Sequence, residues 1–306
     1  MSFSLPRIDD VVARALAEDL GVPADTVLGA IPDPGLFARD VTTHAVVSED
    51  AVFEGAVVAR SGGIVCGLPV AARTWSMLAD AAGLTDAIEV FPLVAEGTAI
   101  APGTAVLEVE GHARLVLAGE RTALNFLMTL SGIATEASRW QAAAGPQLAV
   151  VDTRKTLPGL RALSKYAVRV GGAHNHRTGL FDMVLVKDNH IRHAGGIASA
   201  VAAARASAPG LLVEVEADTV VQAIEAARAG ADMVLLDNMD DAALREAVSV
   251  VREIAVSAER EVLTEASGRI TFERLASLGA IGVDRVSSSA LTLARPLDFG
   301  LDESNR

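Results

Sequence analysis

The second half of the chain alternates short apolar runs with longer alanine-rich segments, and this alternation constrains the fold more than any other feature. Short apolar runs are typical of strands, and the segments between them repeat apolar residues with the period of a helix. The predicted strands are Leu148–Val151, Met183–Val186, Leu211–Val215, Met233–Leu236, Glu261–Leu263 and Ile281–Val286. The predicted helices between them are Gly195–Ala208, Thr219–Ala229, Asp241–Val256 and Thr271–Leu278. This order indicates βα units with a parallel sheet, and so many units favour a barrel over an open sheet.

The first half of the chain predicts a different, α+β arrangement. Ala51–Arg60 and Ala105–Val109 alternate apolar and polar residues, as half-buried antiparallel strands do. The remaining segments are a helix over Pro69–Ala82, a connecting helix over Gly119–Ala144, and a proline-containing loop or insertion over Val22–Arg39.

Composition excludes several classes of protein. No apolar run reaches the roughly 18 residues of a membrane span, and the N-terminus does not have the pattern of a secretory signal. Cys66 is the only cysteine, which excludes an internal disulfide and a cysteine-based zinc cluster. The net charge of −13 argues against general binding to nucleic acid or anionic membrane. We therefore expect a soluble, cytoplasmic protein.

Basic residues are concentrated in one segment of this acidic chain. The only lysines are Lys155, Lys165 and Lys187, and Asp152–His193 contains eight Lys or Arg against three Asp or Glu. This concentration predicts an anion site; the alternative is a chance cluster on a solvated face.

Charged residues also follow the predicted strands, where the catalytic groups of a parallel barrel lie. The strand ends carry Asp152–Lys155, Lys187–His190, Glu214–Asp218, Asp237–Asn238 and Glu265–Gly268. A cationic half facing an acidic half suits a polyanion that binds together with Mg²⁺.

The loop after the first strand adds His174, His176 and Arg177 to the cationic half. Arginine suits a carboxylate because its planar guanidinium forms two parallel hydrogen bonds. The histidines could instead bind zinc, but no third ligand has suitable spacing.

Pro158–Val170 predicts a helix capped by Thr156, with basic residues on one face. The alternative to an anion site here is a solvated basic face, which we expect for Arg169. Arg161 and Lys165 lie closer to the predicted anion site, and for them both interpretations stay open.

Acidic and small residues complete the predicted site. Glu216 and Asp237 could hold Mg²⁺ or ribose hydroxyls, or could be ordinary surface carboxylates. Glu214 shares a strand face with Glu216, so the sequence does not choose between them. Ser267-Gly268 could present backbone N–H groups to a phosphate.

Several motifs resemble those of the quinolinate phosphoribosyltransferase family. The resemblance rests on DTRKTLPGLRALSKYAV from Asp152, GGAHNHRTGL from Gly171, VLVKDNHI from Val184 and GERTALNFLMTLSGIAT from Gly119. Weaker matches are AEDLG, DVTT, VEVEADT and LLDNM. The likeness covers nearly the whole chain.

The resemblance implies an α/β fold: an N-terminal open-faced α/β sandwich over residues 1–117, completed by about residues 291–306, and an incomplete α/β barrel over residues 118–290. It implies an enzyme that converts quinolinate and phosphoribosyl pyrophosphate to nicotinate mononucleotide, pyrophosphate and CO₂, with Mg²⁺. It also implies a homodimer with shared active sites.

The resemblance further implies roles for individual residues. Residues for quinolinate are Arg121 from the partner subunit, Arg154, His176, Arg177 and Lys187. Residues for phosphoribosyl pyrophosphate and its Mg²⁺ are Lys155, Glu216, Asp237, Ser267, Gly268 and Ser289, of which Lys155, Glu216 and Asp237 are the catalytic candidates.

The chain departs from the family pattern at three places. Ser289–Ala294 replaces the family's usual Gly-Ala-Leu-Thr-His-Ser, Arg269 stands where a small or neutral residue is common, and the Val22–Arg39 insertion is atypical. The altered Ser289–Ala294 segment leaves open a relative associated with molybdenum transport that acts on another substrate. Two further alternatives are a non-catalytic anion-binding protein and an aldolase-type barrel with Lys187 as a Schiff-base lysine.

Overall fold

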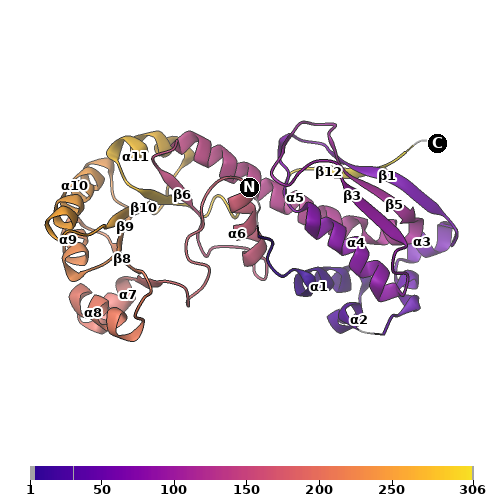
Figure 1. Cartoon of the computed structure of the whole chain (residues 1–306), viewed down its shortest axis with the longest axis horizontal. Coiled ribbons are helices and arrows are strands. Elements are labelled where there is room, and N and C mark those ends of the chain that lie inside the picture. The colour runs from indigo at the N-terminus through magenta and orange to yellow at the C-terminus, as the bar shows by residue number, and fades with distance from the viewer. Residues whose placement is uncertain (1–3, 30, 305–306) are drawn as a thin grey trace. The chain divides into compact units, whose positions relative to one another are not determined.

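The computed structural model describes residues 4–29 and 31–304, and its contacts divide the chain into two compact units. Unit 1 comprises Met1–Glu136, Leu157–Gly171 and Ala294–Arg306, and unit 2 comprises Ala137–Thr156 and Gly172–Leu293. The expected boundary near Leu117 falls inside helix α5 (Ala113–Ala144), which belongs to both units (Figure 1).

Unit 1 is built around an antiparallel sheet in the order β12-β1-β5-β3. These strands are β1 (Val52–Ala59), β3 (Ile88–Pro92), β5 (Ala105–His112) and β12 (Phe299–Glu303). A small second sheet pairs β2 (Gly63–Ile64) with β4 (Ala99–Ile100). The helices of unit 1 are α1 (Asp9–Leu20), α2 (Ala24–Leu28), α3 (Val41–Val46), α4 (Leu68–Ala82), α6 (Arg161–Val170) and most of α5, with a 3₁₀ helix, η1 (Pro34–Arg39).

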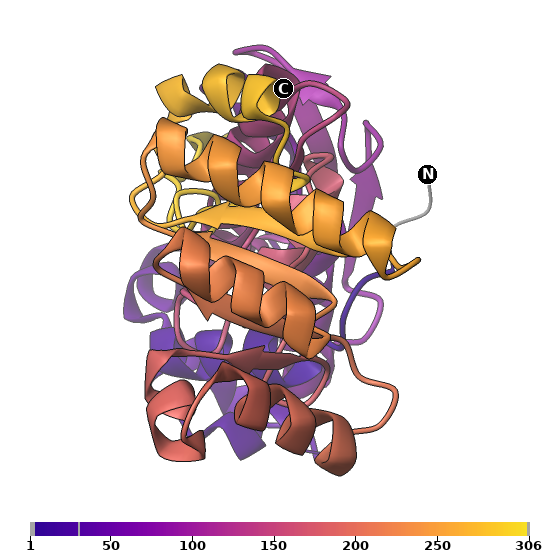
Figure 2. The ribbon, with the colours of Figure 1, turned by 90° about the vertical axis from the view of Figure 1, so that its left-hand side faces the viewer.

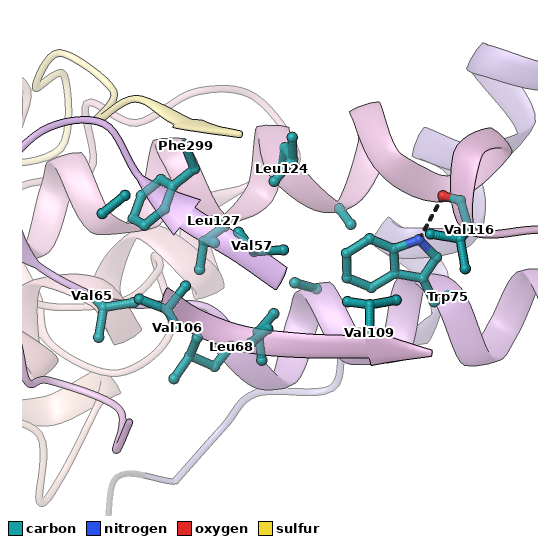
Figure 3. Close-up of a cluster of buried hydrophobic side chains, with 14 of the residues drawn as sticks. Val57, Val65, Leu68, Trp75, Val106, Val109, Val116, Leu124, Leu127 and Phe299 are labelled. Atoms are coloured by element: carbon teal, nitrogen blue, oxygen red, sulfur yellow. Dashed lines mark hydrogen bonds between the residues drawn. The ribbon is translucent and has the colours of Figure 1, made fainter. Parts of the chain in front are cut away.

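The core of unit 1 lies between this sheet and helices α4 and α5. Along β1 every second residue is buried, as the alternation in its sequence predicts, and Val57 packs in the same cluster as Val109 and Trp75 (Figure 3). The indole N–H of the fully buried Trp75 donates to the carbonyl of Val116, 3.0 Å away. This arrangement matches the open-faced sandwich that the resemblance implies.

Unit 2 is a six-stranded parallel sheet in the order β6-β11-β10-β9-β8-β7. Its strands are β6 (Ala149–Val151), β7 (Val184–Val186), β8 (Val213–Ala217), β9 (Met233–Asp237), β10 (Leu263–Ser267) and β11 (Arg285–Ser287). Its helices are α7 (Asp188–Ala194), α8 (Ile197–Ser207), α9 (Val220–Ala229), α10 (Asp241–Ser257) and α11 (Leu275–Ile281), with a 3₁₀ helix, η2 (Phe272–Arg274). Helices α8, α9 and α10 lie side by side over one face of the sheet (Figure 2).

The barrel of unit 2 is incomplete because its edge strands, β6 and β7, do not pair with each other in the described part of the chain. Instead His174 forms an isolated parallel bridge with Val151 of β6. The loop that carries His174 and His176 is thereby attached to the open side of the sheet.

Local sequence explains where the helices of unit 2 begin and end. Thr219 and Asp240 accept backbone N–H groups at the N-termini of α9 and α10. Gly195, Gly230 and Gly282 end α7, α9 and α11 in the left-handed conformation.

Two predicted helices are confirmed but begin two or three residues later than predicted, because of glycine. The helix predicted over Pro158–Val170 begins only at Arg161, after a turn in which Gly159 has φ +79°, so Thr156 does not cap it. The helix predicted over Gly195–Ala208 begins at Ile197, because Gly195 and Gly196 have φ +81° and +138°.

Two other segments contain more helix than the sequence predicted. The connecting helix begins at Ala113, directly after β5. The expected loop Val22–Arg39 contains α2 and η1, which the buried side chains of Val27 and Leu36 anchor in unit 1.

Candidate active site

A cavity of about 340 Å³ lies at the carboxyl ends of the strands in unit 2. This is the edge of a parallel α/β barrel where active sites form. The lining residues are Thr153, Arg154, Lys155, His176, Arg177, Leu185, Lys187, Leu235, Glu265, Ser267 and Ser287. The structure therefore brings together Arg154, Lys155, His176, Arg177, Lys187 and Ser267 of the predicted site.

The cationic side chains of this cavity are crowded. Burial lowers the pKa of Arg177 from its ordinary value, and the positive charge of Arg154 lowers it further. Two guanidinium groups that repel each other are stabilised when an anion lies between them. A ligand with more than one carboxylate or phosphate fits this cavity on charge.

Lys187 and Glu216 form an ion pair at the ends of β7 and β8. The side chain of Glu216 is 15% exposed and that of Lys187 is 44% exposed. The backbone N–H of Lys187 donates to His190 Nδ1 at 2.9 Å, which fixes the start of α7.

Glu214 and Glu216 occupy different levels of β8. The pairs Glu216↔Leu235 and Glu214↔Met233 place Glu216 two residues nearer the carboxyl end of the sheet. Glu214 is fully buried, whereas Glu216 is partly accessible. Glu216 is therefore the carboxylate that can reach a ligand at the strand ends.

A buried polar cluster that the sequence analysis missed adjoins the cavity, whose lining includes its members His176 and Glu265. Nε2 of His176 is 2.9 Å from Oε2 of Glu214 and 3.5 Å from Oε1 of Glu265. Oε2 of Glu265 is 3.1 Å from Nε of Arg285. The available signal was a glutamate in the interior of a strand buried on both faces, since a buried charge needs a partner.

Asp152 holds the loop that carries His176. Its fully buried carboxylate accepts the side-chain N–H of Asn175 at 2.6 Å and the backbone N–H of His176 at 2.9 Å. Sequence reasoning placed Asp152 at the strand end without assigning it a role.

The ends of β9 and β10 form a tight pair of turns beside Asp237. Gly268 has φ +82°, and a Cβ atom there would lie 2.5 Å from Oδ1 of Asn238, so only glycine fits. The Nε group of Arg269 donates to that same Oδ1 at 3.2 Å. Arg269 is exposed, and this hydrogen bond places its guanidinium at the Asn238 turn.

The segment Ser289–Ala294, which differs from the family pattern, begins just after β11. Leu293 donates its backbone N–H to the carbonyl of Ser289 at 3.1 Å, and the Thr292 hydroxyl donates to the carbonyl of Lys155 at 2.7 Å. Ser289 is partly buried and does not line the cavity, whereas Ser287 does.

Arg121 lies in unit 1, whereas the other residues that the resemblance assigns to the active site lie in unit 2. Its side chain is 60% exposed and 3.6 Å from Glu120. It lines a hollow of about 780 Å³ formed by α1, α5 and the start of α6, together with Arg7 and Arg14.

The remaining basic candidates lie on α6, also in unit 1. Lys165 is buried, Arg161 is half-buried and Arg169 is exposed, which confirms the expectation for Arg169. His174 is exposed, so of the two loop histidines only His176 belongs to the buried cluster.

The fold and the cavity define a class: an α/β-barrel protein with an anion-binding site at the carboxyl ends of its strands. Comparison with known families narrows this class. The family model described as "Quinolinate phosphoribosyl transferase, N-terminal domain" matches residues 40–131, and its C-terminal counterpart matches residues 133–302.

Individual relatives agree with the family models. The chain is 40% identical over 280 residues to the nicotinate-nucleotide pyrophosphorylase [carboxylating] of Mycobacterium leprae, covering 91% of this chain and 96% of that one. It is 40% identical over 262 residues to the human protein of that name, covering 84% of each. The crystal structure of NadC from Streptococcus pyogenes has a TM-score of 0.84 at 35% identity, covering 99% of this chain and 100% of that chain. The chain belongs to the quinolinate phosphoribosyltransferase family.

Proposed function

We propose that this protein converts quinolinate and phosphoribosyl pyrophosphate to nicotinate mononucleotide, pyrophosphate and CO₂, a step of NAD biosynthesis. The observation that carries the proposal is the cationic cavity at the strand ends of unit 2, in a chain whose relatives carry this enzyme's name over most of their length. A dicarboxylate and a polyphosphate are the ligands that such a cavity suits on charge.

The proposed quinolinate site consists of Arg154, Arg177 and Lys187, with His176 beside them. Mutual repulsion between the two guanidinium groups favours a ligand with two adjacent carboxylates. Nicotinate lacks one carboxylate and would leave a cation of the cavity unpaired, which disfavours its binding.

The proposed metal site uses Glu216 and Asp237. Both place hard carboxylate oxygens at the ends of neighbouring strands, a donor set that suits Mg²⁺. Bound Mg²⁺ would supply positive charge to the leaving pyrophosphate. Because Lys187 pairs with Glu216, we expect this ion pair to rearrange when both substrates are bound.

The proposed phosphate contacts are Lys155, the Ser267-Gly268 turn and Ser289. Lys155 is exposed and lines the cavity, so its ammonium group can contact a phosphate bound there. Glycine at position 268 allows the turn after Ser267 to lie close to Asn238, where a Cβ atom would clash. Ser289 contributes through its backbone, where the family has glycine.

In the proposed reaction, the pyridine nitrogen attacks C1 of the ribose and the bond to pyrophosphate breaks with its electron pair. The ring becomes cationic, so the bond to the 2-carboxylate can break, leaving the electron pair on C2 and releasing CO₂. C2 then takes a proton. Glu216 or Asp237 stabilises the positive charge that develops at C1, and Arg154 and Lys187 hold the carboxylates in place.

We also propose a homodimer in which Arg121 completes the partner's site. The side chain of Arg121 is 60% exposed, so it is accessible to a second copy of the chain. A cytoplasmic location belongs to the same proposal, since both substrates are charged metabolites. No helix in the described residues is long and apolar enough to cross a membrane.

The test is incubation of the purified protein with Mg²⁺, phosphoribosyl pyrophosphate and quinolinate labelled in its 2-carboxylate, with nicotinate as a parallel substrate. We expect labelled CO₂ together with nicotinate mononucleotide, and no product from nicotinate. A folded protein that binds both substrates but releases no CO₂ would contradict the proposal.

A further inference from the structure

The imidazole of His176 is engaged at both ring nitrogens. Its Nδ1 accepts the backbone N–H of Arg177 at 2.7 Å. Because an amide N–H can only donate, Nδ1 carries no proton and the ring proton lies on Nε2. Nε2 lies 2.9 Å from Oε2 of the buried Glu214 and 3.5 Å from Oε1 of the buried Glu265, within ion-pair distance of both carboxylates.

Burying the two carboxylates beside the His176 ring costs free energy. Glu214 and Glu265 are both fully buried, and the described contacts supply one guanidinium, that of Arg285, for the two of them. Burial, and then the charge of Glu214, raises the pKa of Glu265 to about 7. A buried pair of like charges usually destabilises a fold, so a role other than stability is the simpler explanation.

The cluster borders the cavity, because His176 and Glu265 are among the residues that line it. Glu214 comes from β8, Glu265 from β10 and Arg285 from β11, while His176 comes from the loop beside β6. The His176 backbone is held by Asp152 and its ring by the glutamates. These contacts fix the peptide between His176 and Arg177, and with it the direction in which the Arg177 side chain leaves the backbone.

We propose that Glu214 and Glu265 are positioning residues for the dicarboxylate pocket, which act through the His176 ring to hold Arg177 toward the ligand. His176 itself then serves the pocket mainly through its ring orientation, because both ring nitrogens have protein partners. The proposal rests on the proposed function, since its readout is the Michaelis constant for quinolinate.

One other chemistry fits the same atoms. The three side chains could hold a divalent cation, because one donor atom of each lies within 4.8 Å of the others. Arg285 beside Glu265 makes the arrangement without metal the better fit, since its guanidinium already supplies positive charge there.

The experiment compares Glu214→Gln and Glu265→Gln with the unmodified protein. Both changes keep the shape of the side chain and remove its charge. We expect the quinolinate KM to rise roughly tenfold, with the KM for phosphoribosyl pyrophosphate changing less than about twofold. The matched control is Asp284→Asn, in which a carboxylate that accepts Thr264 N–H at the opposite end of the sheet becomes an amide. It should lower the melting temperature and leave both KM values unchanged.

A double-mutant cycle separates positioning from general stability. His176→Asn keeps a polar atom near the position of Nδ1 but removes the group at the position of Nε2, and with it the contact to the glutamates. This variant should therefore show the same rise in the quinolinate KM. In that background Glu214→Gln should add no further rise. If Glu214→Gln does not fold, Glu265→Gln and His176→Asn give the same test.

Four outcomes would overturn the inference: an unchanged quinolinate KM, an equal rise in both KM values, additive effects in the cycle, or a stoichiometric metal lost with Glu214→Gln. Absence of turnover by the unmodified protein would instead contradict the proposed function. The two failures are therefore distinguishable.

Discussion

At the residue scale, sequence predicted the cationic side of the site better than its buried acidic part. Arg154, Lys155 and Lys187 follow directly after predicted strands, and all three line the cavity. The choice between Glu214 and Glu216 needed the strand register, because both side chains point to the same face and differ only in depth. Depth in a sheet is a tertiary property that side-chain alternation does not encode.

Glu265 leads to a prediction about pH. Its folded-state pKa is raised from 4.5 to about 7, so its contribution to stability is complete below about pH 4.5 and is lost as the pH rises through about 7. Glutamine cannot ionise, so the unfolding free energy of Glu265→Gln minus that of the unmodified protein should increase by about 1–3 kcal/mol from pH 5 to 8. Denaturant unfolding at several pH values measures this difference. A difference independent of pH would contradict the assignment.

Arg269 leads to a prediction about backbone strain. Its φ of +46° is left-handed, a conformation that costs a non-glycine residue about 1–2 kcal/mol. Arg269→Gly and Arg269→Ala both lose the contact with Asn238, but only glycine relieves the strain. The glycine variant should therefore be more stable than the alanine variant by about 1 kcal/mol in denaturant unfolding. Equal stabilities would show that the turn is not strained.

At the element scale, the period of the sequence predicted the strands of unit 2 in the correct order. The strand predicted over Glu261–Leu263 was misplaced, since it shares only Leu263 with β10, which continues to Ser267. The errors in the helices fall where glycines decide the outcome, as at Gly159 and Gly195, and where short helices lack a periodic signal, as in α2 and η1. Both depend on contacts with other parts of the chain. The pairing of β12 with β1 joins segments more than 200 residues apart, and only the family resemblance anticipated it.

Gly132 leads to a prediction about the segment that carries β12. A Cβ atom at this helical position would lie 2.2 Å from the carbonyl oxygen of Arg295, which is backbone and cannot move aside. Gly132→Ala should lower the unfolding free energy by about 1–3 kcal/mol. Gly279→Ala is the control, because its nearest atom is 3.8 Å away, and it should be neutral or stabilising by up to about 1 kcal/mol. Similar effects of the two changes would contradict this packing.

At the scale of the whole molecule, the proposed sharing of active sites in a homodimer predicts that two inactive variants complement each other. Arg121→Ala removes the residue given to the partner, and Arg154→Ala removes one from the subunit's own cavity. After unfolding and refolding together, mixed dimers should contain one intact site, giving about a quarter of the unmodified activity. Recovery of no activity from well-folded mixed dimers would place Arg121 outside the partner's site.

The central claim is that the cavity of unit 2 releases CO₂ from quinolinate and that its arginines bind the substrate. The most direct measurement is kcat/KM for quinolinate, followed by release of labelled CO₂, in Arg154→Ala and in Arg169→Ala. Arg169 is exposed on α6 and serves as the matched control. We predict a fall of about 100-fold or more for Arg154→Ala, since it removes charge-assisted hydrogen bonds, and an unchanged value for Arg169→Ala. Equal turnover by Arg154→Ala and the unmodified protein would contradict the account.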